Sequence, residues 1–275
     1  MSRVARAGAK GWTIDSLHDA AYDSYLPLFE KLVPRLLAAE RDLPRAYAEP
    51  LALLRTWDLR WSAESVPTTL AVYWGMMLLQ QTPDPDLAKV NLYDRYARDI
   101  DTRKLVDAWV AAVDRISNDF GTWRMRWGDV NRFQRATDFD DAAPSIAVPF
   151  TESMWGSLAA LGVRTGAEAK KLYGVEGNSF VAIVDFGPRV HARAIMAGGA
   201  SADPTSKHFA DQAVRDTEAS YATCTSIPTS APARSSGATS SAPGRRDARA
   251  QPRQHLERAH HGFLTPFPRF GGRRV

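Results

Sequence analysis

One short segment brings together the residue types of a hydrolytic triad: Ser201, Ser206, His208 and Asp211. In such a triad the imidazole takes the proton of the serine hydroxyl, and the carboxylate orients the imidazole. Here His208 and Asp211 are spaced i, i+3, as on one helix, and no glycine-framed turn presents either serine as a nucleophile. We therefore interpret the segment as a tight turn in which Ser206 caps a helix that begins near Lys207.

Other motifs that carry chemistry are not found in the sequence. It has no Gly-x-Gly-x-x-Gly, no Walker loop, no His-Glu-x-x-His and no Gly-x-Ser-x-Gly. The six histidines lack metal-ligand spacing to acids or thiols, and Cys224 is the only cysteine, which excludes an internal disulfide. His191 lies in an alternating segment and is interpreted as a residue of a sheet. The sequence predicts no catalytic, cofactor-binding or metal-binding residue in this chain.

The tryptophans are the remaining candidates for a binding role. All eight lie between Trp12 and Trp155. Several could line a pocket for an apolar acyl group, because aromatic rings supply a large contact area. Packing in the core is the favoured interpretation for most of them, namely Trp57, Trp61, Trp74, Trp123, Trp127 and Trp155.

Helical patterns dominate the first part of the chain. From Thr13 onward apolar residues recur at intervals of three or four, and Pro27 and Pro34 are expected to break this stretch into short pieces. A buried helix is predicted over residues 69–80, with N-cap oxygens from Ser62 or Ser65 and Pro67 in the first turn. An amphipathic helix is predicted over residues 102–117.

Strand patterns follow after about residue 150. Ser157–Leu161 is a short apolar run, and residues 179–186 and 190–196 flank Gly187-Pro188 as an antiparallel hairpin. Helices first and paired strands afterwards indicate an α+β fold.

The charge is divided unevenly along the chain. Residues 217–275 hold nine arginines, no lysine and three acids, which gives this segment a net charge of +6. Because the whole chain has a net charge of +4, residues 1–216 have a net charge of −2. The tail is rich in Ser, Ala, Pro and Arg and cannot bury enough apolar surface to fold. We place a domain boundary at residue 216 and expect residues 217–275 to be disordered. No apolar run is long enough to span a membrane.

Several segments, in order, resemble the C-terminal half of the β subunit of the penicillin acylase (penicillin amidase) family. The resemblance covers roughly residues 13–216, and its most specific parts are Leu53-Leu-Arg-Thr-Trp-Asp and Ser206-Lys-His-Phe-Ala-Asp-Gln. The other matching segments are Ala21-Tyr-Asp-Ser-Tyr-Leu-Pro, Ser65-Val-Pro-Thr-Thr-Leu, Trp127-Gly-Asp-Val-Asn-Arg, Gly177-Asn-Ser-Phe and Gly199-Ala-Ser-Ala-Asp-Pro.

The resemblance implies the fold and chemistry of an N-terminal-nucleophile hydrolase. Such enzymes have an αββα sandwich, of which this chain would hold a part. They hydrolyse the amide between an acyl side chain and an amine, as in β-lactam antibiotics or acyl-homoserine lactones. Their nucleophile is the N-terminal serine of the processed β chain, whose own α-amino group serves as the base, and an asparagine contributes to the oxyanion hole. The parent family is periplasmic.

By the order of the matching segments, Met1 falls after the family's nucleophile and oxyanion asparagine, and Ser2 lacks the expected Gly-Ser junction. We expect the chain to be a fragment that is inactive alone, with no catalytic residue, no cofactor of its own and a family calcium site lying upstream. Its expected partners are an upstream acylase segment or α subunit and an acyl-amide substrate.

The arginine-rich tail supports a second hypothesis, in which a non-catalytic protein binds nucleic acid or another acidic surface. Between Tyr221 and Phe263 the tail has no aromatic residue to stack on bases, so nucleic acid is disfavoured as a partner. We further hypothesise that residues from about 217 to 250 are translated from a shifted reading frame, because this stretch lacks lysine and has the Arg/Ser/Ala/Pro-rich composition expected of a GC-rich gene.

Overall fold

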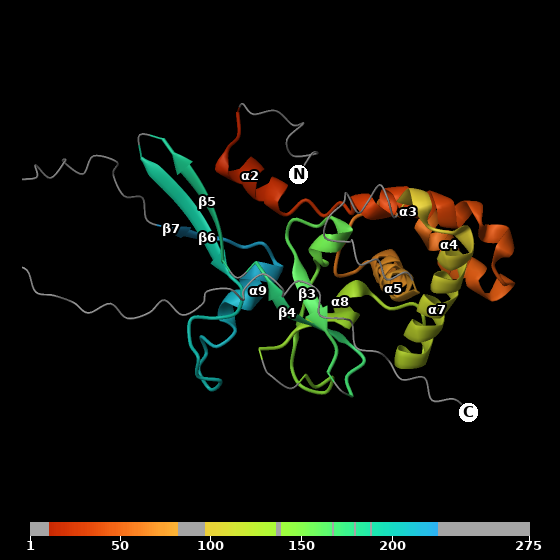
Figure 1. Ribbon diagram of the computed structural model, residues 1–275. Coiled ribbons are helices and arrows are strands. Elements are labelled where there is room, and N and C mark those ends of the chain that lie inside the picture. The colour runs from red at the N-terminus through yellow and green to blue at the C-terminus, as the bar shows by residue number, and fades with distance from the viewer. Residues whose placement is uncertain are drawn as a thin grey trace, which may run out of the picture. The chain divides into compact units, whose positions relative to one another are not determined.

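The computed structural model describes residues 11–81, 97–135, 139–166, 168–178, 180–187 and 189–224. It confirms the α+β class: helices fill the first half of the chain and paired strands follow in the second half (Figure 1). Residues 225–275, which make up most of the tail, lie outside the described residues, so disorder of the tail stays a prediction. The last described elements extend past the predicted boundary at 216, with α9 ending at Thr217 and β7 covering Ala222–Cys224.

The first helices show how the two prolines act in this chain. Helix α2 (Ile14–Ala21) begins with a capping box between Thr13 and Ser16. Helix α3 (Pro27–Ala38) has Pro27 in its first turn and Pro34 in its interior. The predicted break at Pro34 is therefore wrong, because burial of an apolar face around it holds the helix together. Two 3-10 turns and another helix follow: η1 (Glu40–Asp42), η2 (Arg45–Tyr47) and α4 (Ala48–Arg55).

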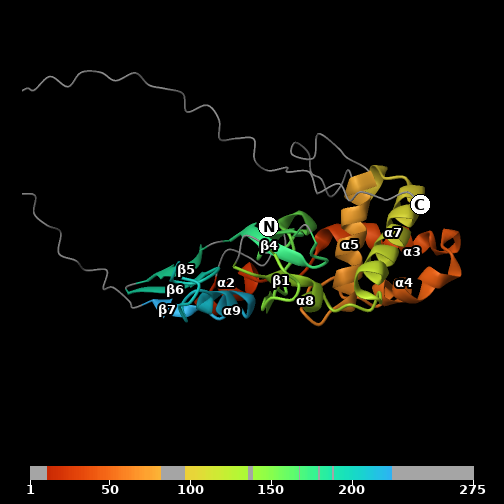
Figure 2. The ribbon, with the colours of Figure 1, turned by 90° about the horizontal axis from the view of Figure 1, so that it is seen from below.

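Two long helices form the centre of the helical half. Helix α5 (Val66–Gln81) is buried along most of its length and begins where Ser65 Oγ accepts the Thr68 N–H at 3.0 Å, as predicted. Helix α7 (Thr102–Phe120) is capped by Asp101 and ends at Gly121, whose φ of 77° is left-handed. They pack side by side (Figure 2), and the indole N–H of Trp74 donates to the Leu105 carbonyl at 3.0 Å.

The strands form two small sheets. The first has the order β2-β1-β4-β3 and includes one parallel pair, β1 with β4. The second has the order β5-β6-β7, and its β5–β6 hairpin confirms the predicted one. The strand bounds are β1 (Asn131–Phe133), β2 (Ile146–Ala147), β3 (Leu161–Arg164), β4 (Leu172–Gly177), β5 (Phe180–Phe186) and β6 (Val190–Met196).

One predicted strand lies elsewhere. Ser157–Leu161 is not a strand; β3 begins only at Leu161. The apolar run before it is buried in irregular backbone, where Ser157 Oγ accepts the Trp61 indole N–H at 2.9 Å and donates to the Ala159 carbonyl. A short apolar run does not distinguish a strand from other buried backbone.

A buried indole joins the helical half to the strand half. Trp155, in the turn η3 (Ser153–Trp155), is 1% exposed and stacks on Phe29 with ring centroids 5.4 Å apart. Its ring also faces Gly75 so closely that a Cβ there would lie 2.5 Å from it. Of the six tryptophans for which core packing was considered, Trp74, Trp127 and Trp155 are buried, whereas Trp57, Trp61 and Trp123 are only partly buried. No helix in the described ranges is long and apolar enough to cross a membrane.

Candidate functional site

The segment with the triad-like residue types is a folded turn. Ser201 Oγ accepts the N–H of Asp203 at 3.1 Å, and Ser206 Oγ accepts the N–H of His208 at 3.2 Å. The His208 ring pairs instead with Asp211, with 2.9 Å between Nδ1 and Oδ2. Both hydroxyls therefore serve backbone turns, and neither is hydrogen-bonded to the imidazole, in agreement with the interpretation from the sequence.

The predicted helix begins later than expected. Helix α9 (Asp211–Thr217) begins at Asp211 rather than near Lys207. The intervening backbone folds back on the loop, since the Ser201 N–H donates to the His208 carbonyl at 3.0 Å. Arg135 fixes this arrangement by donating to the carbonyls of Ser201 (2.8 Å) and Phe209. These contacts between distant residues, rather than the Ser206 cap, decide where α9 begins.

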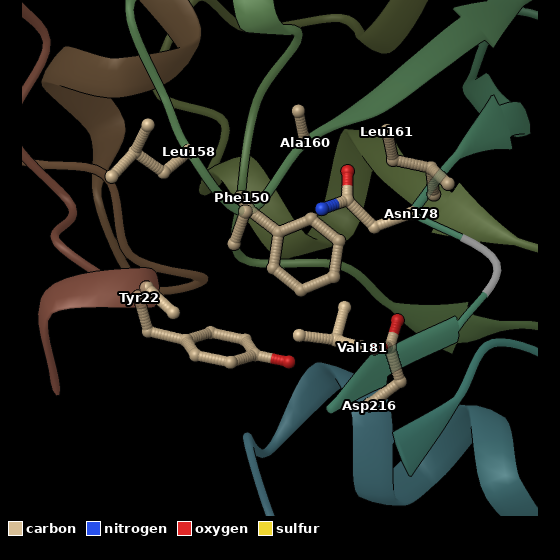
Figure 3. A pocket seen from close by; sticks show the side chains of 10 residues that line it. Tyr22, Phe150, Leu158, Ala160, Leu161, Asn178, Val181 and Asp216 are labelled. Atoms are coloured by element: carbon tan, nitrogen blue, oxygen red, sulfur yellow. The ribbon is translucent and has the colours of Figure 1, made fainter. Parts of the chain in front are cut away.

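A cavity of about 280 Å³ lies between four segments that are far apart in the sequence (Figure 3). The end of α2 contributes Tyr22, β3 and the segment before it contribute Leu161 and Phe150, β5 contributes Val181, and α9 contributes Asp216. Most of the other lining residues are apolar: Ala21, Leu158, Ala159 and Ala160, with Asn178 as the one further polar residue. Its walls are thus apolar, with a few polar groups, as in typical small-molecule pockets.

Asp216 is the one ionisable carboxyl that lines the cavity, and its residue is 8% exposed. Burial raises the pKa of this carboxyl to about 6, and a hydrogen bond with the Tyr22 hydroxyl opposes the shift. Burial also raises the pKa of Tyr22, and smaller contributions in the same direction come from a hydrogen bond with Tyr221 and from the nearby charge of Asp216. The carboxyl is therefore protonated in mildly acid solution and ionised above about pH 7.

Aromatic rings hold Tyr22 in place beside the cavity. His18 stacks on Tyr22 with centroids 5.3 Å apart, and Tyr221 meets it edge-on at 5.8 Å. The His18 Nε2 lies 2.7 Å from the Ala219 carbonyl. A carbonyl only accepts, so Nε2 carries the proton. This contact ties α2 to the backbone that follows α9.

Sequence reasoning did not identify Tyr22 or Asp216 as site residues. Both residues line the cavity although they lie 194 positions apart in the sequence. Neither lies in a motif of chemical spacing, so only the tertiary fold reveals the pair.

A second buried carboxyl lies outside this cavity. Burial raises the pKa of Glu152 from its ordinary 4.5 to about 7, while the Val163 N–H, which donates to Oε1 at 3.5 Å, opposes the shift and Glu176 adds to it. His191 is exposed on β6 opposite Asp185, as expected for a sheet residue. The described ranges hold no group of three or more His, Cys, Asp or Glu that could bind a metal.

Comparison with known families gives one match. The family described as penicillin amidase matches residues 1–229, which is more than half of the chain. No curated protein matches the chain at a significant level.

Proposed function

Since the chain belongs to the penicillin amidase family, an acylase-like family of amide hydrolases, we propose that it is one part of such an acylase. The complete enzyme would hydrolyse the amide between an acyl side chain and an amine, in β-lactam antibiotics or acyl-homoserine lactones. Its partners are an upstream acylase segment or α subunit, and the upstream part of the β chain supplies the N-terminal serine, whose amino group is the general base. This chain supplies core and pocket wall. The match over residues 1–229 carries the proposal.

The strand β5 supports the proposed need for an upstream partner. Among the described strands β5 pairs only with β6, so it forms one edge of its sheet. It also exposes two large apolar side chains, Phe180 (62% exposed) and Phe186 (82% exposed). Free strand edges and exposed apolar side chains favour pairing with another chain. An upstream strand added along β5 would cover both features.

Reconstitution tests the proposed division of labour. The full chain is mixed with a separately produced upstream acylase segment that carries the Gly-Ser junction, and acid release is measured from a phenylacetyl amide and from a long-chain acyl-homoserine lactone. We expect release only from the mixture, and none when the junction serine is replaced by alanine. Hydrolysis by the chain alone, or no hydrolysis by the assembled mixture, would contradict the proposal.

A variant of the exposed edge separates assembly from chemistry. Phe186→Asp should weaken binding of the upstream segment by at least about tenfold, because it places a charge where apolar area would be buried. Val214→Asp is the matched control, since Val214 is an exposed apolar residue (42%) of α9. Equal effects of the two variants on binding would rule out β5 as the contact.

A further inference from the structure

The cavity between α2, β5 and α9 combines apolar walls with a buried acid. Figure 3 shows the Tyr22 hydroxyl and the Asp216 carboxyl on either side of Val181. Phe150, Leu158 and Leu161 supply apolar surface around them. A ligand that fills this space must offer an apolar body and a polar end that suits these two groups.

Asp216 has no cationic partner among the described residues: none of the salt bridges they form involves it, and its side-chain partner is the Tyr22 hydroxyl. Removing an ionised carboxyl from water is costly unless it is paired. Its raised pKa, about 6, reflects that cost, and above pH 7 the group is nevertheless mostly ionised. A cation that enters the cavity would restore the missing pairing.

The volume limits the size of the ligand. An apolar cavity of about 150 Å³ holds one benzene ring, and each further heavy atom, taken as the size of a water molecule, needs roughly 30 Å³. The 280 Å³ found here therefore accommodates a ring with a chain of about four further heavy atoms. An aryl group on a short alkyl chain fits that limit.

We propose that this cavity binds a primary ammonium carried on a small aryl-alkyl body, with Asp216 accepting from the ammonium, the Tyr22 hydroxyl held beside it and the ring against Phe150 and Val181. The Asp216 carboxylate favours an ammonium ligand, because it repels an anion of the same shape and forms a weaker hydrogen bond with a neutral hydroxyl. The proposal rests on the lining of this cavity and does not depend on the acylase chemistry proposed above.

Three probes of nearly equal shape test the proposal on the full chain at pH 7.5. They are 2-phenylethylamine, 2-phenylethanol and phenylacetate, which differ in charge at one end, and binding is followed by ligand-observed NMR and calorimetry. We expect the amine to bind with a Kd on the order of 1 mM, as its small size allows, and the alcohol at least about tenfold more weakly. We expect no binding of phenylacetate. Phenylacetate binding as tightly as the amine, or equal affinity for amine and alcohol, overturns the proposal without any variant.

Two variants then locate the site. Asp216→Asn should reduce the affinity for the amine about tenfold, to that for the alcohol, because the amide has the same shape and no charge. Val181→Phe should abolish binding of both ligands by filling the cavity. Circular dichroism establishes that each variant keeps the fold. Unchanged amine affinity in a folded Asp216→Asn protein would show that the ammonium binds elsewhere.

Discussion

Replacing Glu152 by glutamine should stabilise the protein in alkaline solution and leave it nearly unchanged in acid. Burial raises the pKa of Glu152 from 4.5 to about 7, so between these pH values the folded chain holds a proton that the unfolded chain has released. The folded state binds more protons in this window, and its stability relative to the unfolded state therefore falls as the pH rises from 4.5 to 7. Glutamine resembles the protonated carboxyl and does not titrate.

The expected magnitude follows from the size of the shift. A shift of 2.5 pKa units, from 4.5 to about 7, corresponds to at most about 3 kcal/mol at 1.36 kcal/mol per unit. The Glu152 residue retains some exposure, so water screens part of this and the expected gain is about 1 to 3 kcal/mol at pH 8. At pH 4 both proteins carry a neutral side chain there, and the expected difference is near zero.

Urea unfolding followed by tryptophan fluorescence measures this difference at pH 4 and pH 8. Glu168→Gln is the matched control, because Glu168 is exposed and the chemical change is the same. The control should leave the free energy of unfolding unchanged within about 0.5 kcal/mol at both pH values. If Glu152→Gln changes stability equally at pH 4 and pH 8, the carboxyl does not titrate as the structure implies and the reasoning fails.

Three further substitutions test other parts of the fold, the first two by thermal unfolding and the third by limited proteolysis. Gly199→Ala should lower the free energy of unfolding by more than about 2 kcal/mol, because the new Cβ would lie under 3.0 Å from two carbonyl groups. Gly187→Ala is the control: the atom nearest to its Cβ lies at 3.6 Å, so the expected loss is less than about 1 kcal/mol. Similar losses in the two variants would refute this prediction. Asn131→Ala should cost about 2 to 4 kcal/mol, because the buried amide donates to two carbonyls at 2.9 Å; a loss below about 1 would contradict it. Arg135→Met should leave the carbonyls of Gly199 and Ser201, in the loop before α9, without this donor and increase proteolysis of the loop severalfold, and an unchanged cleavage rate would argue against that anchor.

The helices and the hairpin were predictable from the sequence because local signals and burial agree there. Helix α5 has its cap at Ser65 and an apolar run, and the β5–β6 hairpin has β-branched strands around a turn. The prediction for α9 failed because Arg135, which is far away in the sequence, holds the preceding backbone in a turn. Pro34 illustrates the same limit, since a buried apolar face outweighs a local breaker.

The candidate site was beyond sequence reasoning for a related reason. Neither Tyr22 nor Asp216 lies in a sequence motif of catalytic or metal-ligand spacing. Their chemical interest comes from burial beside each other, which depends on packing between α2, β5 and α9. Spacing in a sequence detects sites built from one element, and this cavity is built from several.

The contact of Trp155 with Gly75 and Phe29 also bears on how the chain folds while it is being synthesised. Helix α5 reaches its full burial only when the indole of Trp155, which lies 80 positions after Gly75 in the sequence, is in place. At about 5 to 20 residues per second, translation takes roughly 4 to 16 seconds to supply it. During that interval the surface of α5 around Gly75 and the ring of Phe29 lack the indole that covers them in the folded protein.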